Sequence, residues 1–396
     1  MKQEKSKVIK KFDKINPSQL LLAIVIFYWM SLYTYPSLLT PYLSEIGATL
    51  TQAGLIVGSY GFTQMILRFP LGVYADHIGK KKIFIVLGMI TSLISSLGFI
   101  FTQNVWLILI LRSLAGVSAS FWVQITSLYI NYSTDSTKAV SQLNFTNNLG
   151  LIIGIFLGGQ VISRFGYKYG FVLGAILAVI GLVLSLLLPA EEPAQTNKIK
   201  ISENNQNKRR FNFIDKGLIW GSIFAAFSQY LTFSTSQGFI AQHADMLGAS
   251  AAEISLMSTI NTIARIIVIV LVYQVLLRFF TIKHILVGSM LLYALFIFFV
   301  PFISNYYWLY LIMFLMGMSS GTQMTYFMDV ATRHIESHYK SSAMGFYQAV
   351  YGIGMVVGPA ITGFVADISS ISLAFISVGI VGLISTVLMI VQLPNE

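Results

Sequence analysis

Long apolar runs separated by short charged or polar segments fill almost the whole chain. Each run is close to the length of about 20 apolar residues that a helix needs to cross the hydrocarbon core of a membrane. The pattern predicts twelve spans. They are expected at 18–40, 51–75, 81–101, 104–129, 139–163, 167–189, 214–238, 250–276, 281–302, 306–329, 341–365 and 370–392.

The composition agrees with a membrane protein. Of the 396 residues, 56% are hydrophobic and only 10% are charged, whereas a soluble domain carries about a quarter of charged residues. Cysteine is absent, so disulfides, thiolate catalysis and cysteine metal sites are excluded. The five histidines are scattered, and none pairs with a carboxylate at a metal-binding spacing. We therefore expect an all-α membrane protein without metal or cofactor.

The position of the cations predicts the topology. The formal charge of +10 comes from lysines and arginines that punctuate the apolar runs, which argues for a membrane protein and against nucleic-acid binding. Nearly all of them fall in loops on the side of the N-terminal tail, while Arg164 and Lys168 fall on the other side. We expect both termini in the cytoplasm, with the basic start retained as a tail and not removed as a signal.

One long polar segment divides the chain. Residues 190–213 are rich in Pro, Asn, Gln and mixed charges and cannot bury apolar area, so we expect a cytoplasmic linker. The predicted organisation is a tail at 1–17, a six-helix bundle at 18–189, the linker, and a second six-helix bundle at 214–396.

The two bundles echo one another. Gly47-Ala48-Thr49 recurs about 200 residues later as Gly248-Ala249-Ser250, and the glycines of the fifth span recur at a similar distance in the eleventh. This is the pattern of parallel repeats related by an axis along the membrane normal.

The turn between the second and third spans is the most specific motif. It reads GVYADHIGKKK from Gly72 to Lys82. Any tight basic turn at a membrane surface would explain its lysines. The spacing Gly-x-x-x-Asp-x-x-Gly-Lys-Lys resembles the signature loop of the major facilitator superfamily of secondary transporters. The resemblance implies a gating role for Gly72, Asp76, Gly79, Lys80 and Lys81.

With the helix count, linker and repeat, the resemblance extends over the whole chain. It implies alternating access around a cavity between the halves, lined by spans one, four, seven and ten. Asp76 would hold the inner gate by accepting bonds from the start of the eleventh span, near Ser341 and Ser342. Aromatic, amide and cationic residues of the cavity spans and of the eighth span are candidate ligands, although packing or interfacial anchoring would also explain each. They are Tyr33, Trp122, Gln124, Tyr230, Gln237, Arg265, Gln323 and Tyr326.

Two embedded charges are candidates for proton coupling. Arg112 lies inside the fourth span, where an unpaired guanidinium is costly and needs a cavity or a partner. The sequence Arg112 to Gly116 resembles the family's fourth-helix motif, whose arginine is associated with proton coupling, but Ala115 stands in place of the usual glutamine. A structural arginine bonded to nearby carbonyls is the alternative. Asp329, near the inner end of the tenth span, is the candidate proton carrier.

These observations predict proton-coupled export of small amphipathic or organic solutes, in the manner of multidrug efflux. The first span contains no acid, which argues against cationic drugs as substrates. The alternatives are an uptake permease for an anionic solute, which Arg112 and Arg265 favour, and a lipid flippase. No nucleotide loop or nucleophile elbow suggests an enzyme. We expect a monomer in a plasma membrane, one that binds a small molecule, protons and lipid and is of bacterial origin.

Overall fold

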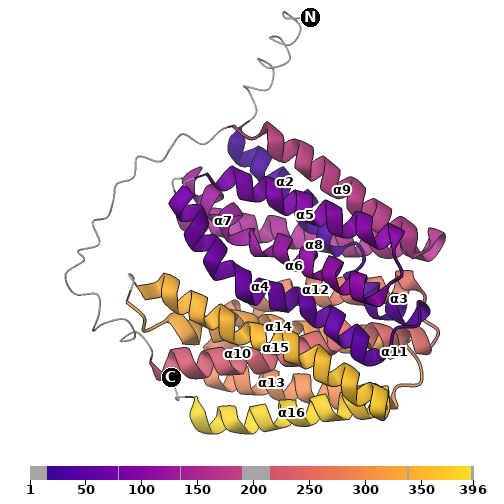
Figure 1. Ribbon diagram of the computed structural model, residues 1–396. Helices are drawn as coiled ribbons and strands as arrows, with labels where there is room; N and C mark the ends of the chain where they lie inside the picture. The colour runs from indigo at the N-terminus through magenta and orange to yellow at the C-terminus, as the bar shows by residue number, and fades with distance from the viewer. Residues whose placement is uncertain (1–15, 79, 134, 190–214, 337–338, 394–396) are drawn as a thin grey trace, which may run out of the picture.

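A computed structural model describes residues 16–78, 80–133, 135–189, 215–336 and 339–393. The described residues form helices and no strand. The linker expected at 190–213 and nearly all of the tail at 1–17 lie outside them. Figure 1 shows the helices side by side as one elongated bundle, with residues 16–189 on one side and residues 215–393 on the other.

The first half contains six membrane-crossing stretches. The first is broken at Pro36 into α2, η1 and α3, and the fourth is divided into α6 and α7 at Phe121. Their bounds are α2 Pro17–Tyr33, η1 Pro36–Leu38, α3 Leu39–Glu45, α4 Leu50–Ile78, α5 Lys81–Phe101, α6 Val105–Ser120, α7 Trp122–Asn131, α8 Ser136–Phe165 and α9 Tyr167–Leu187.

The second half repeats this arrangement. Its first stretch passes through the π-helical segment η3 and ends beyond the expected residue 238. The bounds are α10 Lys216–Ser234, η3 Thr235–Phe239, α11 Ile240–Met246, α12 Ala251–Gln274, η4 Leu276–Arg278, α13 Ile282–Phe299, η5 Val300–Phe302, α14 Tyr307–Thr332, α15 Lys340–Ile368 and α16 Ile371–Gln392. The twelve expected spans are confirmed, with shifted ends.

Nine stretches among the described residues are long and apolar enough to cross a membrane by length and composition alone. The other three are α4, the run from α10 to α11, and α14. Each of them contains several hydroxyl, amide and glycine residues. A helix inside a membrane protein can carry such groups because the other helices shield them from lipid.

We call the side where α2 begins and α16 ends the terminal face, and the opposite side the far face. At the far face both halves turn in the same way. Gly47 and Gly248 have φ of +82° and +86°, a conformation that glycine adopts without a steric penalty. The next helix then starts with a capping box, made by Thr49 with Gln52 and by Ser250 with Glu253. The sequence repeat therefore corresponds to a repeated turn.

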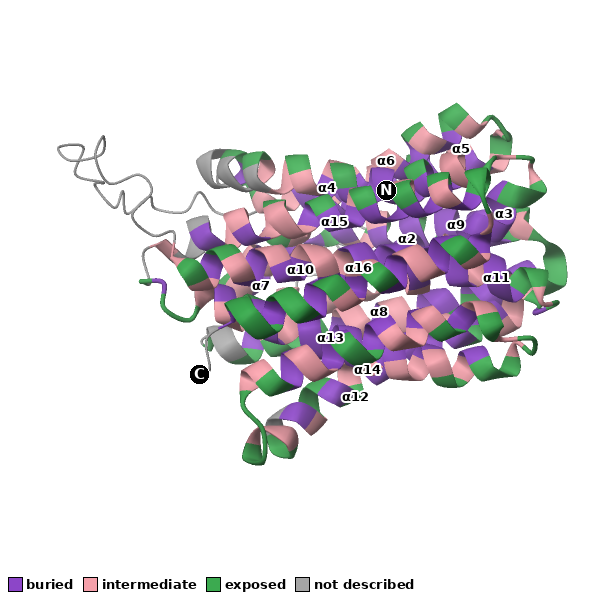
Figure 2. Ribbon diagram, turned by 90° about the horizontal axis from the view of Figure 1, so that it is seen from below, coloured by how far each residue is buried: buried purple, intermediate pink, exposed green. Residues whose placement is uncertain are grey.

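Exposed and buried residues alternate along the outer helices, as Figure 2 shows for α13 and α16, and many of the exposed residues are large and apolar. On α16 the exposed apolar residues recur at helical spacing, which produces one lipid-facing side. They are Leu373, Ile380, Ile384, Val387, Leu388, Ile390 and Val391.

Two helix pairs join the halves, α4 with α15 and α8 with α12. Both approach closely at glycine. A Cβ atom on Gly54 would lie 2.1 Å from the Pro359 carbonyl oxygen, and one on Gly159 would lie 2.1 Å from Cβ of Ser255. Small residues at these positions let the helix backbones come together, which is how membrane helices commonly associate.

Candidate functional site

The far face is closed by contacts between the halves. The Thr40 hydroxyl donates to the Gly238 carbonyl at 2.9 Å. The Leu50 and Thr51 amides donate to the two carboxylate oxygens of Asp367, each at 2.8 Å. Asp367 therefore binds the start of α4, where the helix dipole favours a negative charge. Access to the interior from the far face requires these contacts to break.

Arg112 lies deep inside the first half. Its side chain is 5% exposed, and the guanidinium carbon lies 4.4 Å from the ring centre of Tyr60 and 5.6 Å from that of Tyr35. A desolvated cation–π contact of this kind contributes about 2 kcal/mol. It leaves the guanidinium N–H groups free, and Nε and Nη1 have no hydrogen-bond partner. The local environment thus stabilises the charge without neutralising it.

The other candidates of the first half gather around Trp29 of α2. Its ring centre lies 5.4 Å from that of Trp122 and 5.8 Å from that of Tyr33. Gln124, two residues after Trp122 on α7, is 2% exposed, and neither its amide nitrogen nor its oxygen has a partner. Spans one and four therefore contribute a group of aromatic rings, and span four also contributes a buried, unsatisfied amide.

In the second half, Arg265 and Gln323 come from neighbouring helices. Arg265 is half-buried on α12, and its Nη2 donates to the sulfur of Met324 at 3.3 Å. Gln323 of α14 is fully buried and accepts from the Ser228 hydroxyl at 2.6 Å, which leaves its Nε2 without a partner.

The remaining predicted ligands are less directly connected to these groups. Tyr230 is buried where α10 packs against α15, next to Gly358. Tyr326 is buried on α14, and Gln237 is half-buried in the π-helical segment η3. A π-helical segment inside an α-helix is frequently found at a functional site.

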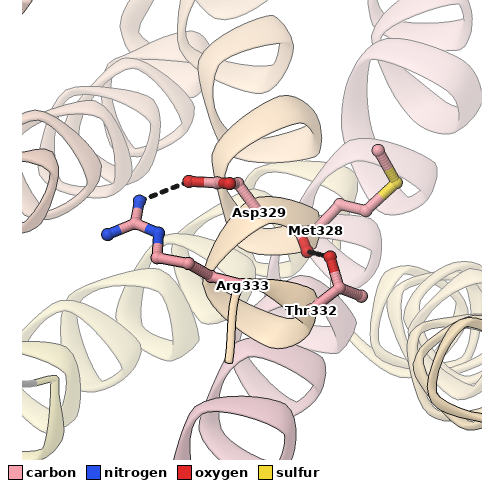
Figure 3. Close-up of polar contacts among 4 residues, drawn as sticks. All are labelled: Met328, Asp329, Thr332 and Arg333. Atoms are coloured by element: carbon pink, nitrogen blue, oxygen red, sulfur yellow. Dashed lines mark hydrogen bonds and ion pairs between the residues drawn. The ribbon is translucent and has the colours of Figure 1, made fainter. Parts of the chain in front are cut away.

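Asp329 lies near the terminal end of α14. Its carboxylate forms an ion pair with Arg333 one turn further along the same helix, and the Thr332 hydroxyl donates to the Met328 carbonyl at 2.9 Å (Figure 3). The Asp329 and Arg333 side chains are both partly exposed. The candidate proton carrier therefore has a local partner and belongs to the opposite half from Arg112.

The signature turn lies at the terminal face. Gly72 and Asp76 belong to the last turns of α4, and Lys80 precedes α5. Lys81 donates to the Ser127 hydroxyl of α7 at 2.5 Å, which ties the start of α5 to the fourth span. Gly79 and the side chains of Gly72, Asp76, Ser341 and Ser342 lie outside what the structure describes, so the contact expected of Asp76 stays a prediction.

Sequence reasoning did not single out Asp367, Tyr35 or Tyr60. Asp367 ends an apolar span, and its partners are backbone amides more than 300 residues earlier in the chain. The two tyrosines surround Arg112 from other helices. An acid at the end of an apolar span could have marked Asp367 in the sequence. The contacts of Tyr35 and Tyr60 with Arg112 could be found only from the structure.

A cavity of about 850 Å³ opens at the far face, away from the central arginines. It is lined by far ends of helices of the first half together with Ser250 and Ala251 at the start of α12. Its wall combines polar residues with a cluster of aromatic rings, and the ring centres of Tyr42, Phe99 and Phe171 lie between 5.0 and 6.4 Å apart.

Similar proteins have been described. An uncharacterized MFS-type transporter of Methanocaldococcus jannaschii is 24% identical over 338 residues, 84% of this chain and 86% of that protein. The quinolone resistance protein NorA of Staphylococcus aureus is 31% identical over 121 residues, which are 30% of this chain and 31% of NorA.

Solved structures share the fold. The nucleoside transporter NupG has a TM-score of 0.70 at 16% identity, covering 96% of this chain and 100% of NupG. A bacterial homologue of the human lysosomal transporter Spinster, in an inward-facing and occupied conformation, has a TM-score of 0.74 at 12% identity, covering 95% and 96%. The family model of the Major Facilitator Superfamily matches residues 20–235 and 218–396. The chain therefore belongs to the Major Facilitator Superfamily of membrane transporters.

Proposed function

We propose that this transporter exports small amphipathic organic solutes in exchange for protons, by alternating access. The observation that carries the proposal is the aromatic group of spans one and four, where the Trp29 ring lies close to the rings of Tyr33 and Trp122. An aromatic wall with few polar groups binds solutes that combine an apolar body with a polar end. The partial similarity to a quinolone resistance protein supports export.

In this proposal the terminal face is cytoplasmic and the membrane is the plasma membrane of a bacterium. The lysines of the signature turn, including Lys80, Lys81 and Lys82, lie on that face, in agreement with the positive-inside bias. With its far face closed, the structure then represents the state that receives solute from the cytoplasm. The protein would work as a monomer and without catalytic chemistry.

The proposed gate is the signature turn. When the terminal face closes, Asp76 binds the start of α15, in the same way as Asp367 binds the start of α4 in this structure. The two faces would then alternate between two contacts of one kind, each a carboxylate at a helix N-terminus.

The proposed coupling residues are Arg112 and Asp329. Proton uptake by Asp329 would cancel its charge and release Arg333, its partner in the ion pair. Arg112 would respond through the Tyr60 ring that it contacts, which belongs to α4 and therefore to the gate-bearing helix. Coupling is thus assigned to one charged group in each half.

The experiment uses purified protein in liposomes with an imposed pH gradient and two amphipathic aromatic dyes as probes, the anion 8-anilinonaphthalene-1-sulfonate and the cation ethidium. We expect uphill movement of at least one dye that an ionophore abolishes. Asp329→Asn should lose uphill movement and keep exchange of that dye at equal pH, because binding and rocking do not need the proton. Asp135→Asn, an exposed acid on the same face, is the matched control and should behave as the unaltered protein. Equal uphill movement in Asp329→Asn would disprove its coupling role.

A second candidate function is uptake of an anionic solute. It is favoured by Arg112 and Arg265, neither of which has a carboxylate within 4.0 Å among the described residues. Direction separates the two functions. Uptake predicts that an inward proton gradient drives solute into right-side-out vesicles, and export predicts that the same gradient drives it out.

A further inference from the structure

The membrane-spanning body carries positive charge at its centre and negative charge only at its ends. Arg112 is the eighth residue of α6, and Arg265 lies in the middle of α12. Every acid that the structure places is at or beside the end of a helix. These acids are Glu45, Asp76, Asp135, Asp215, Asp245, Glu253, Asp329, Glu336 and Asp367. The protein itself therefore places no counter-charge beside the central arginines among the described residues.

Arg112 has unmet hydrogen-bonding capacity. It is 5% exposed, and its Nε and Nη1 are buried without an acceptor. The faces of Tyr35 and Tyr60 stabilise the charge, but a ring face does not satisfy the in-plane N–H groups of a guanidinium. A buried cation without a partner is costly inside a membrane and marks a functional position.

Arg265 comes from the opposite half and is more accessible. Its Nη2 donates to the thioether sulfur of Met324 at 3.3 Å, and a thioether is a weak acceptor. Tyr33, at the end of α2, is within electrostatic reach of Arg265 and also interacts with Tyr60, the ring that Arg112 contacts. Tyr33 thus lies between Arg265 of the second half and Tyr60, the ring that Arg112 contacts in the first half.

The side-chain amide of Gln323, in the second half, adds another hydrogen-bond donor without a partner. The oxygen of Gln323 is occupied by Ser228, so the group left over is its N–H₂. Guanidinium and amide N–H groups without acceptors suit a ligand that supplies oxygen acceptors and negative charge.

We propose that the transported solute carries an anionic group, a carboxylate, sulfonate or phosphate, and that Arg265 and Arg112 recognise it around Tyr33. This inference rests on the proposed transport of amphipathic solutes and specifies their charge. The aromatic wall at Trp29 and Trp122 binds the apolar body, and the arginines bind the anionic end. Because the arginines belong to different halves, an anion between them also links the halves during the transport cycle.

The test uses four compounds that share one aromatic body. They are 1-naphthoate, naphthalene-1-sulfonate, 1-naphthyl phosphate and the neutral 1-naphthamide. Thermal stabilisation of the purified full chain in detergent is measured as a function of concentration. We expect at least one anion to raise the melting temperature at concentrations where the amide has no effect, because a ligand that binds only the folded state stabilises it.

Variants identify the residues responsible. Arg265→Gln should raise the half-saturating concentration of the stabilising anion by about 10-fold, equivalent to about 1.4 kcal/mol, and Arg265→Lys should restore part of the affinity. Arg278→Gln, an exposed arginine just beyond the same helix, is the matched control and should leave it unchanged. Arg112→Lys should weaken binding less than Arg112→Gln if charge is what matters.

The outcomes separate this inference from the export proposal. Stabilisation by 1-naphthamide equal to that by the anions, no stabilisation by any of the three anions, or unchanged affinity in Arg265→Gln would each overturn it. Uphill ethidium export in the absence of anion binding would leave export standing and remove the anionic substrate. Anion binding without proton-driven export would support the substrate charge and refute export.

Discussion

The α4–α15 and α8–α12 pairs join the same two halves, but their close-packed glycines face different atoms. Gly54 of α4 faces backbone atoms of α15, whereas Gly159 of α8 faces a side chain of α12. A Cβ on Gly54 would reach the carbonyl oxygen of Pro359, which moves only with its helix. A Cβ on Gly159 would reach Cβ and Oγ of Ser255, which a substitution can remove. The first contact fixes how closely two helices pack, whereas the second depends on one replaceable residue.

The two pairs also differ in charge. The start of α4 is bound by Asp367 from the opposite half, in addition to its own capping box. The start of α12 is capped by Glu253 of its own helix, which also accepts from the Tyr306 hydroxyl at 2.8 Å. The repeat spacing that aligns Gly159 with Gly363 places Ser163 where the other half has Asp367. Opening the far face therefore breaks a charge–dipole contact in one pair and not in the other.

The largest effect is expected from adding one methyl group at each glycine. Gly54→Ala should lower transport by about 10-fold or more, because overpacking against backbone costs about 1–3 kcal/mol. Gly159→Ala should do the same alone and recover in combination with Ser255→Gly. Transport rates at matched expression check this. Recovery of Gly54→Ala by trimming any neighbouring side chain would show that its contact is as adaptable as the other.

A smaller effect is expected from Asp367→Asn. Loss of the charge at the start of α4 should favour the far-open state by about 3- to 10-fold, since such a contact contributes about 1 kcal/mol. The chain has no cysteine, so Ser37→Cys offers one labelling site beside Ser255, 3.4 Å away across the halves. In Asp367→Asn, this cysteine should react faster with a membrane-impermeant maleimide, because the far face is open for a larger fraction of the time.

Two control variants test whether the starts of α4 and α12 differ in their dependence on an acid from the opposite half. Glu45→Gln removes another far-face acid and should leave labelling of Ser37→Cys unchanged. Ser163→Asp introduces an acid at the equivalent place on α8 and should have little effect, because Glu253 already caps α12. Slower labelling in Ser163→Asp, as strong as the acceleration in Asp367→Asn, would mean that the two pairs do not differ in kind.

Sequence alone predicted the helices well, because the length of an apolar run is a local signal. It failed where helices continue through polar residues. The seventh stretch was expected to end at residue 238 and reaches Met246, since the bundle interior shelters Gln242 and His243. It also missed the break in the first stretch at Pro36, where a helix interior loses a hydrogen bond.

The candidate site was predictable residue by residue but not as an arrangement. Arg112 attracted attention because a cation inside an apolar run is unusual, and the structure buries it. Its tyrosine neighbours, and the approach of Tyr33 to Arg265, depend on how four helices pack. Asp367 escaped because its partners are backbone amides, which every residue type other than proline supplies.

A modest effect is expected from Tyr351→Phe. The Tyr351 hydroxyl of α15 accepts from Nη1 of Arg68 on α4 at 2.6 Å. Arg68 keeps its bond to Gln64 in the variant, so the net loss is about 0.5 kcal/mol, near the lower end for one hydrogen bond. Because this contact lies nearer the terminal ends of both helices, labelling of Ser37→Cys at the far face should change by less than about 2-fold. A change larger than that of Asp367→Asn would place the main latch of this pair near Arg68 instead of at the far face.

The smallest effect is expected at the caps, and a double-variant cycle measures it. Thr49→Ala removes the hydroxyl that accepts from the backbone N–H of Gln52, while Asp367 still accepts from the backbone N–H groups of Leu50 and Thr51. Because the Thr49 hydroxyl also bonds to the Asp367 carboxylate, combining Thr49→Ala with Asp367→Asn should destabilise by less than the sum of the two, by about 0.5 kcal/mol, as expected for residues in contact. Ser250→Ala with Asp367→Asn should be additive, because those groups cap different helices. The cycle is read from melting temperatures of the purified protein, and additivity in the first pair would show that α4 is capped by its own residues, as α12 is.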